Sequence, residues 1–455
     1  MKKSTTASSA ALLCAMMCCA QPGVDAVPLS FSVVGNERIV KIEYTLTGEP
    51  AVVTVDLQTN TLASAGGEWV SIGGEAIGEL RGAANKVVRT LGTPVAAYWI
   101  PAGRLQGRAC SFAALRAVVT AWPTNMPPDY MVVDLTAKND SVRWYASTNL
   151  FPRGFSDPRY KTTHLVMRKI PAKGVIWRMG IVEGDECHEP YDVAHNVLLT
   201  YDYYAGIYEL TQSQYRLFNV TSPAAFAFAD KDDSSVRPAE RLGVGALRGQ
   251  KAKAYCWPGD GHNVSGSSVI GLIRARCGIA DMDLPTEAEW EYACRGGSAA
   301  ALTSGKAYTQ ENLDEVAWNS NNASHQTHAV GMLAPNAFGL YDTIGNVYEL
   351  CLDRIAINND AAIEGYLPLY KATFADGWES GAATTNPPGV SDAGITRYSK
   401  RGGSWNYGLN SGMSCGHRSD GAIDYATGDT GTGYIGCRLF CSVEAAVKAA
   451  EKGLE

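Results

Sequence analysis

Residues Asp283–Gly297 read DLPTEAEWEYACRGG, and this stretch predicts a helix with a defined start and stop. Thr286 and Glu289 form a capping box, in which the hydroxyl and the carboxylate bind backbone amides at the start of the helix. Trp290 shares one face with the residues three and four positions later, and Gly296 can adopt the left-handed conformation that ends a helix. A short helix with caps at both ends and one apolar face is therefore expected.

Further motifs follow in a fixed order, namely FGLYDTIGNVYE at Phe338–Glu349, KRGGSW at Lys400–Trp405 and GCRL at Gly436–Leu439. Together with residues 283–297 they resemble the sulfatase-modifying-factor family, which contains the formylglycine-generating enzymes and has a C-type-lectin-like fold. The resemblance covers residues 160–442 and implies a loop-rich module. We therefore expect an α+β protein in which this module follows other elements.

Composition sets the class of protein. The chain has 455 residues, of which 46% are hydrophobic and 19% charged, as is typical of a globular protein with two or three domains. The net charge is −7 and no long run of Lys or Arg occurs, so a nucleic-acid partner is not expected. No segment reaches the roughly 18 apolar residues of a transmembrane helix.

Residues 1–26 have the pattern of a signal peptide. Lys2 and Lys3 supply the positive charge, Ala10–Ala20 the short apolar core, and Val24-Asp25-Ala26 a cleavage site. The pattern predicts an exported protein that is periplasmic, extracellular or held at the cell surface.

The other domain limits come from periodicity. Residues 27–150 contain short alternating segments separated by turns, such as Ile39–Leu46 and Ala51–Leu57, and predict a β-sandwich of fibronectin or immunoglobulin type. Its role is expected to be that of a spacer or docking domain. Residues 151–159 are rich in Pro, Asp and Gly and are interpreted as a linker. Residues 443–455 predict a short solvated helix.

The segment at Tyr341–Leu350 is a candidate cation site. Asp342 and Glu349 flank a Gly-Asn turn, and calcium prefers carboxylates mixed with backbone carbonyls. The resemblance implies a structural calcium ion held by Asp342, Glu349 and the carbonyls of Gly345 and Val347. The alternative is that Glu349 caps nearby amides.

Copper is not expected. The resemblance implies that formylglycine-generating enzymes bind copper through two cysteines after the Gly-Gly-Ser box, and Cu(I) requires such thiolates. Tyr407 and Gly412 occupy those positions here. Ser404 and Cys415 remain the candidate catalytic residues for the alternative function, an oxidoreductase acting on a peptidyl cysteine or another thiol.

Cysteine pairing is partly constrained. Cys437 and Cys441 lie four residues apart in an expected strand, roughly 13 Å, which is too far for a disulfide. The resemblance implies a bridge from Cys294 to Cys437 or Cys441. The alternative is that all of them are buried thiols.

The segment 406–435 is dense in Asn, Tyr, Gly, Ser, Asp and Thr, a composition that binding loops use. Within the superfamily, retroelement-diversified display proteins carry such segments between similar motifs. The sequence therefore favours an exported, non-copper relative that binds a ligand or protein through this surface. The candidate ligand-binding residues are Trp405, Tyr407, Asn410, His417, Arg418, Tyr425 and Tyr434.

Overall fold

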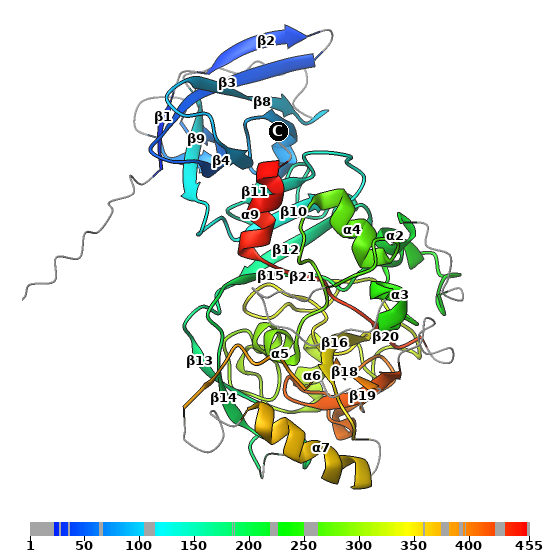
Figure 1. Ribbon diagram of the computed structural model, residues 1–455. Coiled ribbons are helices and arrows are strands. Elements are labelled where there is room, and N and C mark those ends of the chain that lie inside the picture. The colour runs from blue at the N-terminus through cyan, green and yellow to red at the C-terminus, as the bar shows by residue number, and fades with distance from the viewer. Residues whose placement is uncertain are drawn as a thin grey trace, which may run out of the picture.

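The protein is described by a computed structural model (Figure 1). The structure describes residues 22–26, 29–34, 37–62, 67–103, 114–183, 185, 187–218, 226–249, 263–357, 360–374, 382–390, 395, 397–423 and 433–452. Among these residues, no helix has both the length and the apolar character needed to cross a membrane.

Two antiparallel sheets form the N-terminal part. The first has the order β1-β3-β8-β6, with β2 also paired to β3, and the second has the order β5-β4-β7, with β9 also paired to β4. The strands are β1 (Gly23–Ala26), β2 (Ser30–Val34), β3 (Glu37–Thr47), β4 (Ala51–Asn60), β5 (Trp69–Ser71), β6 (Ile77–Gly82), β7 (Lys86–Val88), β8 (Pro94–Pro101) and β9 (Leu115–Pro123).

The two sheets pack face to face. Val40 and Ile42 of β3 alternate with polar residues and meet Val55 and Leu57 of β4 in one buried cluster. Alternation of this kind places every second side chain on the inner face of a sheet. Two packed β-sheets are therefore present as predicted, whereas the fibronectin or immunoglobulin type stays a prediction. Strand β1 pairs with β3 from Gly23↔Thr47 to Ala26↔Tyr44, so the segment predicted to end a signal peptide forms an edge strand here.

A mixed α+β module follows. Its sheets have the orders β11-β10-β12-β15-β21, β13-β14-β17 and β19-β18-β16-β20. The strands are β10 (Tyr130–Asp134), β11 (Val142–Tyr145), β12 (His164–Ile170), β13 (Ile176–Met179), β14 (His195–Leu198), β15 (Tyr203–Gly206), β16 (Tyr348–Arg354), β17 (Thr384–Thr385), β18 (Arg397–Arg401), β19 (Arg418–Ile423), β20 (Ile435–Gly436) and β21 (Phe440–Ser442). The helices are α1 (Arg159–Thr162), α2 (Gln212–Arg216), α3 (Val244–Arg248), α4 (Val269–Cys277), α5 (Glu287–Arg295), α6 (Gln310–Val316), α7 (Asp360–Thr373) and α9 (Val443–Lys452).

Strands β10 and β11 differ from the sequence-based expectation. The prediction placed residues 130–145 in the sandwich, but β10 pairs with β12 from Tyr130↔Arg168 to Asp134↔His164. The physical reason is that the inward residues Met131 and Val133 join the same buried cluster as Met167 and Tyr204 of the later sheet. The segment 151–159, predicted as a linker, therefore connects strands of one sheet.

Helix α5 forms where the sequence predicts it. Thr286 accepts a hydrogen bond from the Glu289 amide, the Glu289 carboxylate accepts one from the Thr286 amide, and Gly296 has φ 60°. Trp290 is buried and its Nε1 donates to Glu349 Oε2 at 2.7 Å. The capping box therefore starts a helix that is buried on all sides at the centre of the module.

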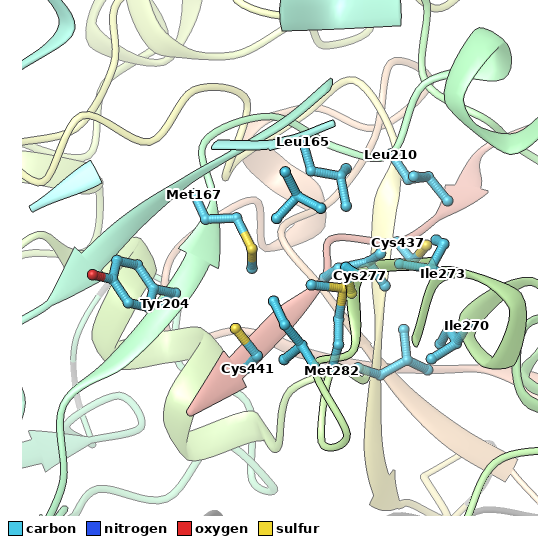
Figure 2. Packing of buried hydrophobic residues seen from close by; sticks show 14 of the residues in the cluster. Leu165, Met167, Tyr204, Leu210, Ile270, Ile273, Cys277, Met282, Cys437 and Cys441 are labelled. Carbon is cyan, nitrogen blue, oxygen red and sulfur yellow. The ribbon is translucent and has the colours of Figure 1, made fainter. Parts of the chain in front are cut away.

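The largest core extends across both parts of the chain. Figure 2 shows the part of it that lies around Cys277 in the module. Val87 of β7 belongs to the same cluster as Met167 and Tyr204, and helix α9 adds Ala446 and other apolar residues to it. The tail is therefore helical as predicted, but it is solvated only on one face, where Lys448 pairs with Glu444. Burying the opposite, apolar face contributes the hydrophobic stabilisation that a free helical tail would lack.

Candidate functional site

The Gly-Gly-Ser corner follows strand β18 and packs on the turn before β16. Gly402 and Gly403 have φ values of 88° and 78°, and a Cβ atom on Gly402 would lie 2.7 Å from the Thr343 carbonyl oxygen. The Gly402 carbonyl accepts a hydrogen bond from the Gly345 amide at 2.9 Å. Glycine is therefore required here for both backbone conformation and close approach.

Ser404 lies buried at this corner. Its hydroxyl donates to Asn406 Oδ1 at 2.8 Å, and its carbonyl accepts from the Tyr407 amide at 3.0 Å. A nucleophilic serine requires a neighbouring base that removes its proton. The partner present is an amide oxygen, which is not such a base, so the geometry supports a role in shaping the corner.

Three tyrosines gather beside the corner. The Tyr407 ring meets the Tyr348 ring edge-on at 5.2 Å, and Tyr434 lies 6.2 Å from both rings. Lys400 is buried beneath them, with Nζ 4.3 Å from the centroid of Tyr348 and 5.0 Å from that of Tyr434. A cation at this distance from an aromatic face is attracted by the ring quadrupole. Burial raises the pKa of the Tyr348 hydroxyl, so that phenol stays protonated.

Trp405 extends the same surface. Its Nε1 donates to the Gly433 carbonyl at 3.1 Å, and its ring meets Phe228 edge-on at 5.7 Å. Trp405, Tyr407 and Tyr434 are half-buried and Asn410 is exposed. These four residues are called the corner surface below. Tyr425 lies outside the described residues.

Three neighbours of the corner surface were not among the predicted site residues. Tyr348 and Lys400 belong to the motifs that identify the fold, and their position inside those motifs is the signal that could have found them. Phe228 comes from a distant segment and carries no comparable signal.

The prediction that Arg418 binds a ligand at the surface is wrong. It is buried, its Nε lies 2.9 Å from Glu287 Oε1, and its guanidinium carbon lies 4.0 Å from the Tyr370 centroid. Helix α7 brings Tyr370 to this position, together with Tyr366, whose hydroxyl contacts Arg418 Nη2 at 2.5 Å. Because Arg418 is neutralised by Glu287 and covered by two tyrosine rings, it stabilises the interior of the module and is not available to a ligand at the surface.

His417 is turned toward the interior as well. Its Nδ1 lies 3.1 Å from Oδ2 of the buried Asp192, whose other oxygen accepts from the Arg418 amide at 3.0 Å. Its side chain is 13% exposed. His417 therefore lies apart from the corner surface and holds the start of β19 against the segment before β14.

The cysteines pair differently from the expectation. Cys294 Sγ lies 3.4 Å from Cys415 Sγ, and both residues are buried. Cys437 and Cys441 instead belong to the core around Cys277 (Figure 2), so the predicted bridge from Cys294 to either of them is wrong. The described cysteines are free thiols. The reason is the path of the chain after β18: the corner places Cys415 at the end of α5, where Cys294 lies, and β21 with Cys441 lies elsewhere.

A buried ionic network lies beneath the corner. Glu287 and Glu291 of α5 face Arg401 of β18 and Arg418 of β19, and Arg295 Nε lies 2.8 Å from Glu291 Oε1. Burial alone would raise the pKa of Glu287, but Arg418 and Arg401 lower it below its ordinary value. The carboxylates are therefore held ionised, and the network fixes α5, β18 and β19 relative to one another.

The predicted calcium turn has a more complex set of partners. Both oxygens of Glu349 accept from Arg438, and Oε2 also accepts from Trp290 Nε1. Asp342 Oδ2 accepts from the Gly331 amide at 2.6 Å, whereas the buried Oδ1 has no protein partner among the described residues. Glu209, which the sequence did not single out, accepts from the Val347 amide at 3.1 Å.

These contacts bear directly on calcium. The Arg438 guanidinium and the Trp290 indole N–H occupy the Glu349 carboxylate, so its partners are side chains and not the nearby backbone amides of the alternative interpretation. Asp342 Oδ1 is the carboxylate oxygen that a cation could still take up. No group of three or more His, Cys, Asp or Glu side chains suited to a metal occurs within the described part of the chain. Calcium held by Asp342, Gly345, Val347 and Glu349 stays a prediction.

One family model and several known proteins are similar to this chain. The family model for the sulfatase-modifying factor enzyme 1-like domain matches residues 170–441. The chain is similar to the chaperone protein LppX of Paenibacillus barcinonensis, with 29% identity over 187 residues, 34% of this chain and 63% of that protein. It is also similar to the formylglycine-generating enzyme of Mus musculus, with 36% identity over 89 residues, 17% of this chain and 24% of that protein.

A third relative is the serine/threonine-protein kinase Pkn1 of Chlamydia trachomatis, 28% identical over 239 residues, 51% of this chain and 33% of the kinase. The chain thus spans less than two thirds of the length of each of these relatives. Among solved structures, Treponema denticola variable protein 1 is 21% identical with a TM-score of 0.41, and the match covers 62% of this chain and 96% of that one. PvdO from Pseudomonas aeruginosa is 19% identical with a TM-score of 0.41, covering 61% and 94%.

Proposed function

Because this chain belongs to the sulfatase-modifying factor enzyme 1-like family, we propose that it is an exported, non-copper member that binds a ligand or protein through its corner surface. The observation that carries the proposal is the packing of Tyr407 and Tyr434 over Tyr348 and Lys400. Rings supported in this way are held in place before a ligand arrives. Tyrosine also offers a large contact area at a low cost in conformational entropy.

The distribution of thiols supports binding over oxidation. A Cu(I) centre of the expected kind requires two thiolates at the corner, and Tyr407 and Gly412 occupy those positions. Cys294 and Cys415 are buried and face each other beneath the corner, and burial raises the pKa of Cys294 well above its ordinary value. A thiol that stays protonated and has no access to solvent is a poor metal ligand and a poor nucleophile.

The chemistry of the ligand follows from the side chains of the corner surface. Trp405, Tyr407 and Tyr434 offer ring faces and edges, and the exposed Asn410 offers an amide that both donates and accepts hydrogen bonds. A partner with apolar groups flanked by hydrogen-bonding groups, such as a peptide segment of a protein, matches this set. Diversification of segment 406–435 by a retroelement would then change the partner and leave the supporting Tyr348 and Lys400 unchanged.

Calcium is proposed as a structural ion. Asp342 would supply one carboxylate oxygen, and Gly345 and Val347 would supply carbonyls next to the corner. Its role would be to stiffen the turn on which Gly402 packs.

The test separates binding from catalysis. Purified protein is incubated with copper, oxygen and a CxPxR peptide, and we expect no aldehyde by mass spectrometry. Aldehyde formation that is lost on Cys415→Ala would overturn the binding function in favour of the oxidoreductase.

Binding itself is measured with the double variant Tyr407→Ser/Tyr434→Ser. Peptides displayed on phage are selected against the wild-type chain, and enriched peptides are then titrated against the variants. The matched control is Tyr98→Ser, a half-buried tyrosine of β8 in the sandwich. The proposal requires that affinity is lost in the double variant and kept in the control; equal affinity in both variants would place the binding surface elsewhere.

Export is tested on the cell. We expect the mature chain in the extracytoplasmic fraction, with its N-terminus inside the segment 20–27 by mass spectrometry. A full-length chain in the cytoplasm would contradict the proposal.

A further inference from the structure

A cavity of about 420 Å³ lies far from the corner surface in the fold, along helix α9. It is formed by the chain between β9 and β10, the turn after β12, the segment before β15, and the helix itself. In Figure 1, α9 lies between the sandwich strands and the sheet that contains β12 and β15. Cavities of roughly 300–1,000 Å³ at the junction of two packed units are the usual places for small ligands.

The cavity has an apolar lining on one side. Tyr201, Val443 and Val447 all contribute to it, and each is less than one tenth exposed. The Tyr201 hydroxyl donates to Glu289 Oε1 at 2.6 Å. Because that hydroxyl is engaged, Tyr201 adds apolar ring surface to the cavity instead of a hydrogen-bond donor.

An exposed lysine and a half-buried aspartate from neighbouring turns line the rim. The Lys173 amide donates to Asp202 Oδ1 at 2.9 Å, which fixes the two turns together. Within the described part of the chain, neither the Lys173 ammonium nor the Asp202 carboxylate takes part in a salt bridge, although both residues line the cavity. The rim therefore offers one positive and one negative side chain to a ligand.

The other charged groups of the lining are already paired. Glu444 pairs with Lys448 on the solvent face of α9. Glu451 Oε2 lies 2.9 Å from Arg89 Nη2 of the sandwich. The complement that the cavity lacks is therefore one anion and one cation held close together.

We propose that this cavity binds a free α-amino acid with an apolar side chain. The α-carboxylate pairs with Lys173, the α-ammonium pairs with Asp202, and the side chain packs on Tyr201, Val443 and Val447. A simple fatty acid would leave Asp202 unpaired and would bring a second negative charge near it. A simple amine would leave Lys173 unpaired and would bring a second positive charge near it. The zwitterion satisfies both groups at once, and this binding is independent of the corner surface.

Isothermal titration calorimetry of the full chain with L-phenylalanine and with L-leucine tests the proposal. N-acetyl-L-phenylalanine and L-phenylalanine amide serve as ligands that each lack one of the two charges. We expect at least one free amino acid to bind, and each derivative to bind roughly fivefold more weakly or not at all, as expected for the loss of one partly exposed ion pair.

The variants locate the site. Lys173→Gln and Asp202→Asn should each weaken binding of the free amino acid by roughly fivefold. Lys448→Gln is the matched control, because Lys448 lines the same cavity but is paired with Glu444, and it should leave the affinity unchanged. Val447→Phe, which fills the cavity with an apolar group, should abolish binding while thermal unfolding reports that the chain still folds.

Two results overturn the proposal. One is the absence of heat with both amino acids at millimolar concentration from a chain that unfolds cooperatively. The other is equal affinity for the free amino acid and for both derivatives, which would show that charge plays no part. If Asp202→Asn disturbs the turn through the Lys173 amide, N-acetyl-L-phenylalanine, which lacks the α-ammonium, still tests the contact with Asp202 in the wild-type chain.

Discussion

The buried network under α5 and the tyrosine cluster that supports the corner surface each hold buried basic side chains, but the groups packed against those side chains differ. Arg401 and Arg418 are matched by Glu287 and Glu291, and each charge has an opposite charge beside it. The Lys400 ammonium lies over the rings of the buried Tyr348 and the half-buried Tyr434. Full pairing makes the first region a rigid support, whereas the second keeps aromatic groups open to a partner.

The largest expected effect on stability comes from removing an arginine of the buried ionic network. Arg418→Met leaves Glu287 buried with less compensation, and we expect a loss of about 3–5 kcal/mol in the free energy of unfolding. The measurement is urea denaturation followed by tryptophan fluorescence. Arg81→Met in the exposed pair with Glu79 is the control and should change stability by less than about 1 kcal/mol. Equal effects of the two variants would contradict the contrast between paired interior and surface.

A second prediction concerns a disulfide between two cysteines that lie next to the buried ionic network. Cys294 and Cys415 are 121 residues apart in sequence but have their sulfurs 3.4 Å apart, so refolding the denatured chain in oxidised glutathione, which reaches the thiols before they are buried, should join them with transfer of the two hydrogens to glutathione. A disulfide that closes a long loop stabilises by about 2–4 kcal/mol. Intact-mass measurement and denaturation of the oxidised chain test this, with Cys294→Ala as the variant that cannot form the bridge. Cys277→Ala should still form it; a bridge that depends on Cys277 would show that a different pair reacts.

The turn beside the corner should make stability depend on pH. Burial raises the pKa of Asp342 from its ordinary value of 3.8 to about 6. The folded chain then holds this proton more tightly than the unfolded chain. The stability that Asp342 contributes is therefore fully present below about pH 4, falls as the pH rises to about 6, and does not change further above that. A difference of about 2 in pKa corresponds to a loss on the order of 3 kcal/mol.

Asp342→Asn isolates this contribution. Asparagine tolerates the positive φ of 54° at this position and cannot ionise, so the variant should lack the fall in stability between pH 4 and pH 6. The same chain tests calcium: if the ion binds at this turn, added calcium should raise the melting temperature above pH 6 in the wild type and less in the variant. A melting temperature that calcium leaves unchanged would remove calcium from the proposed function.

The smallest effect on stability is expected at the corner surface. Tyr407→Ser removes an edge-on ring pair at a half-buried position, which corresponds to about 0.5–1.5 kcal/mol. Thermal unfolding gives this value, and the same variant should nevertheless lose most of the binding to selected peptides. If Tyr407→Ser destabilised the chain as much as Arg418→Met, the corner surface would contribute to stability as much as the buried ionic network, and the contrast between the two regions would be wrong.

Local signals in the sequence were sufficient for some elements. The capping box of Thr286 and Glu289 and the glycine at 296 act within a few residues, so the start and stop of α5 could be predicted and are confirmed. The alternation in β3 and β4 likewise reports directly on which residues face the core of the sandwich. The motifs at Phe338–Glu349 and Lys400–Trp405 predicted the family, which the match over residues 170–441 confirms.

Contacts between distant segments could not be obtained in this way. The pairing of β10 with β12 depends on which hydrophobic faces meet, and both sides of the linker have similar patterns. The approach of Cys294 to Cys415 depends on the path of β18 and the corner. Arg418 looked like a binding residue because its neighbours in sequence are polar, whereas its partners Glu287 and Tyr370 come from α5 and α7.

The position of α9 has a consequence for biosynthesis. Ala446 and Ala449, close to the last described residue, share a core with Val52 and Val87 from the first hundred residues. A ribosome therefore releases the two sides of this core far apart in time. The sandwich strands and the large sheet keep apolar surface uncovered until α9 has been synthesised. A deletion that removes α9 would leave this apolar surface of the sandwich and the large sheet uncovered, so aggregation during synthesis is its expected consequence.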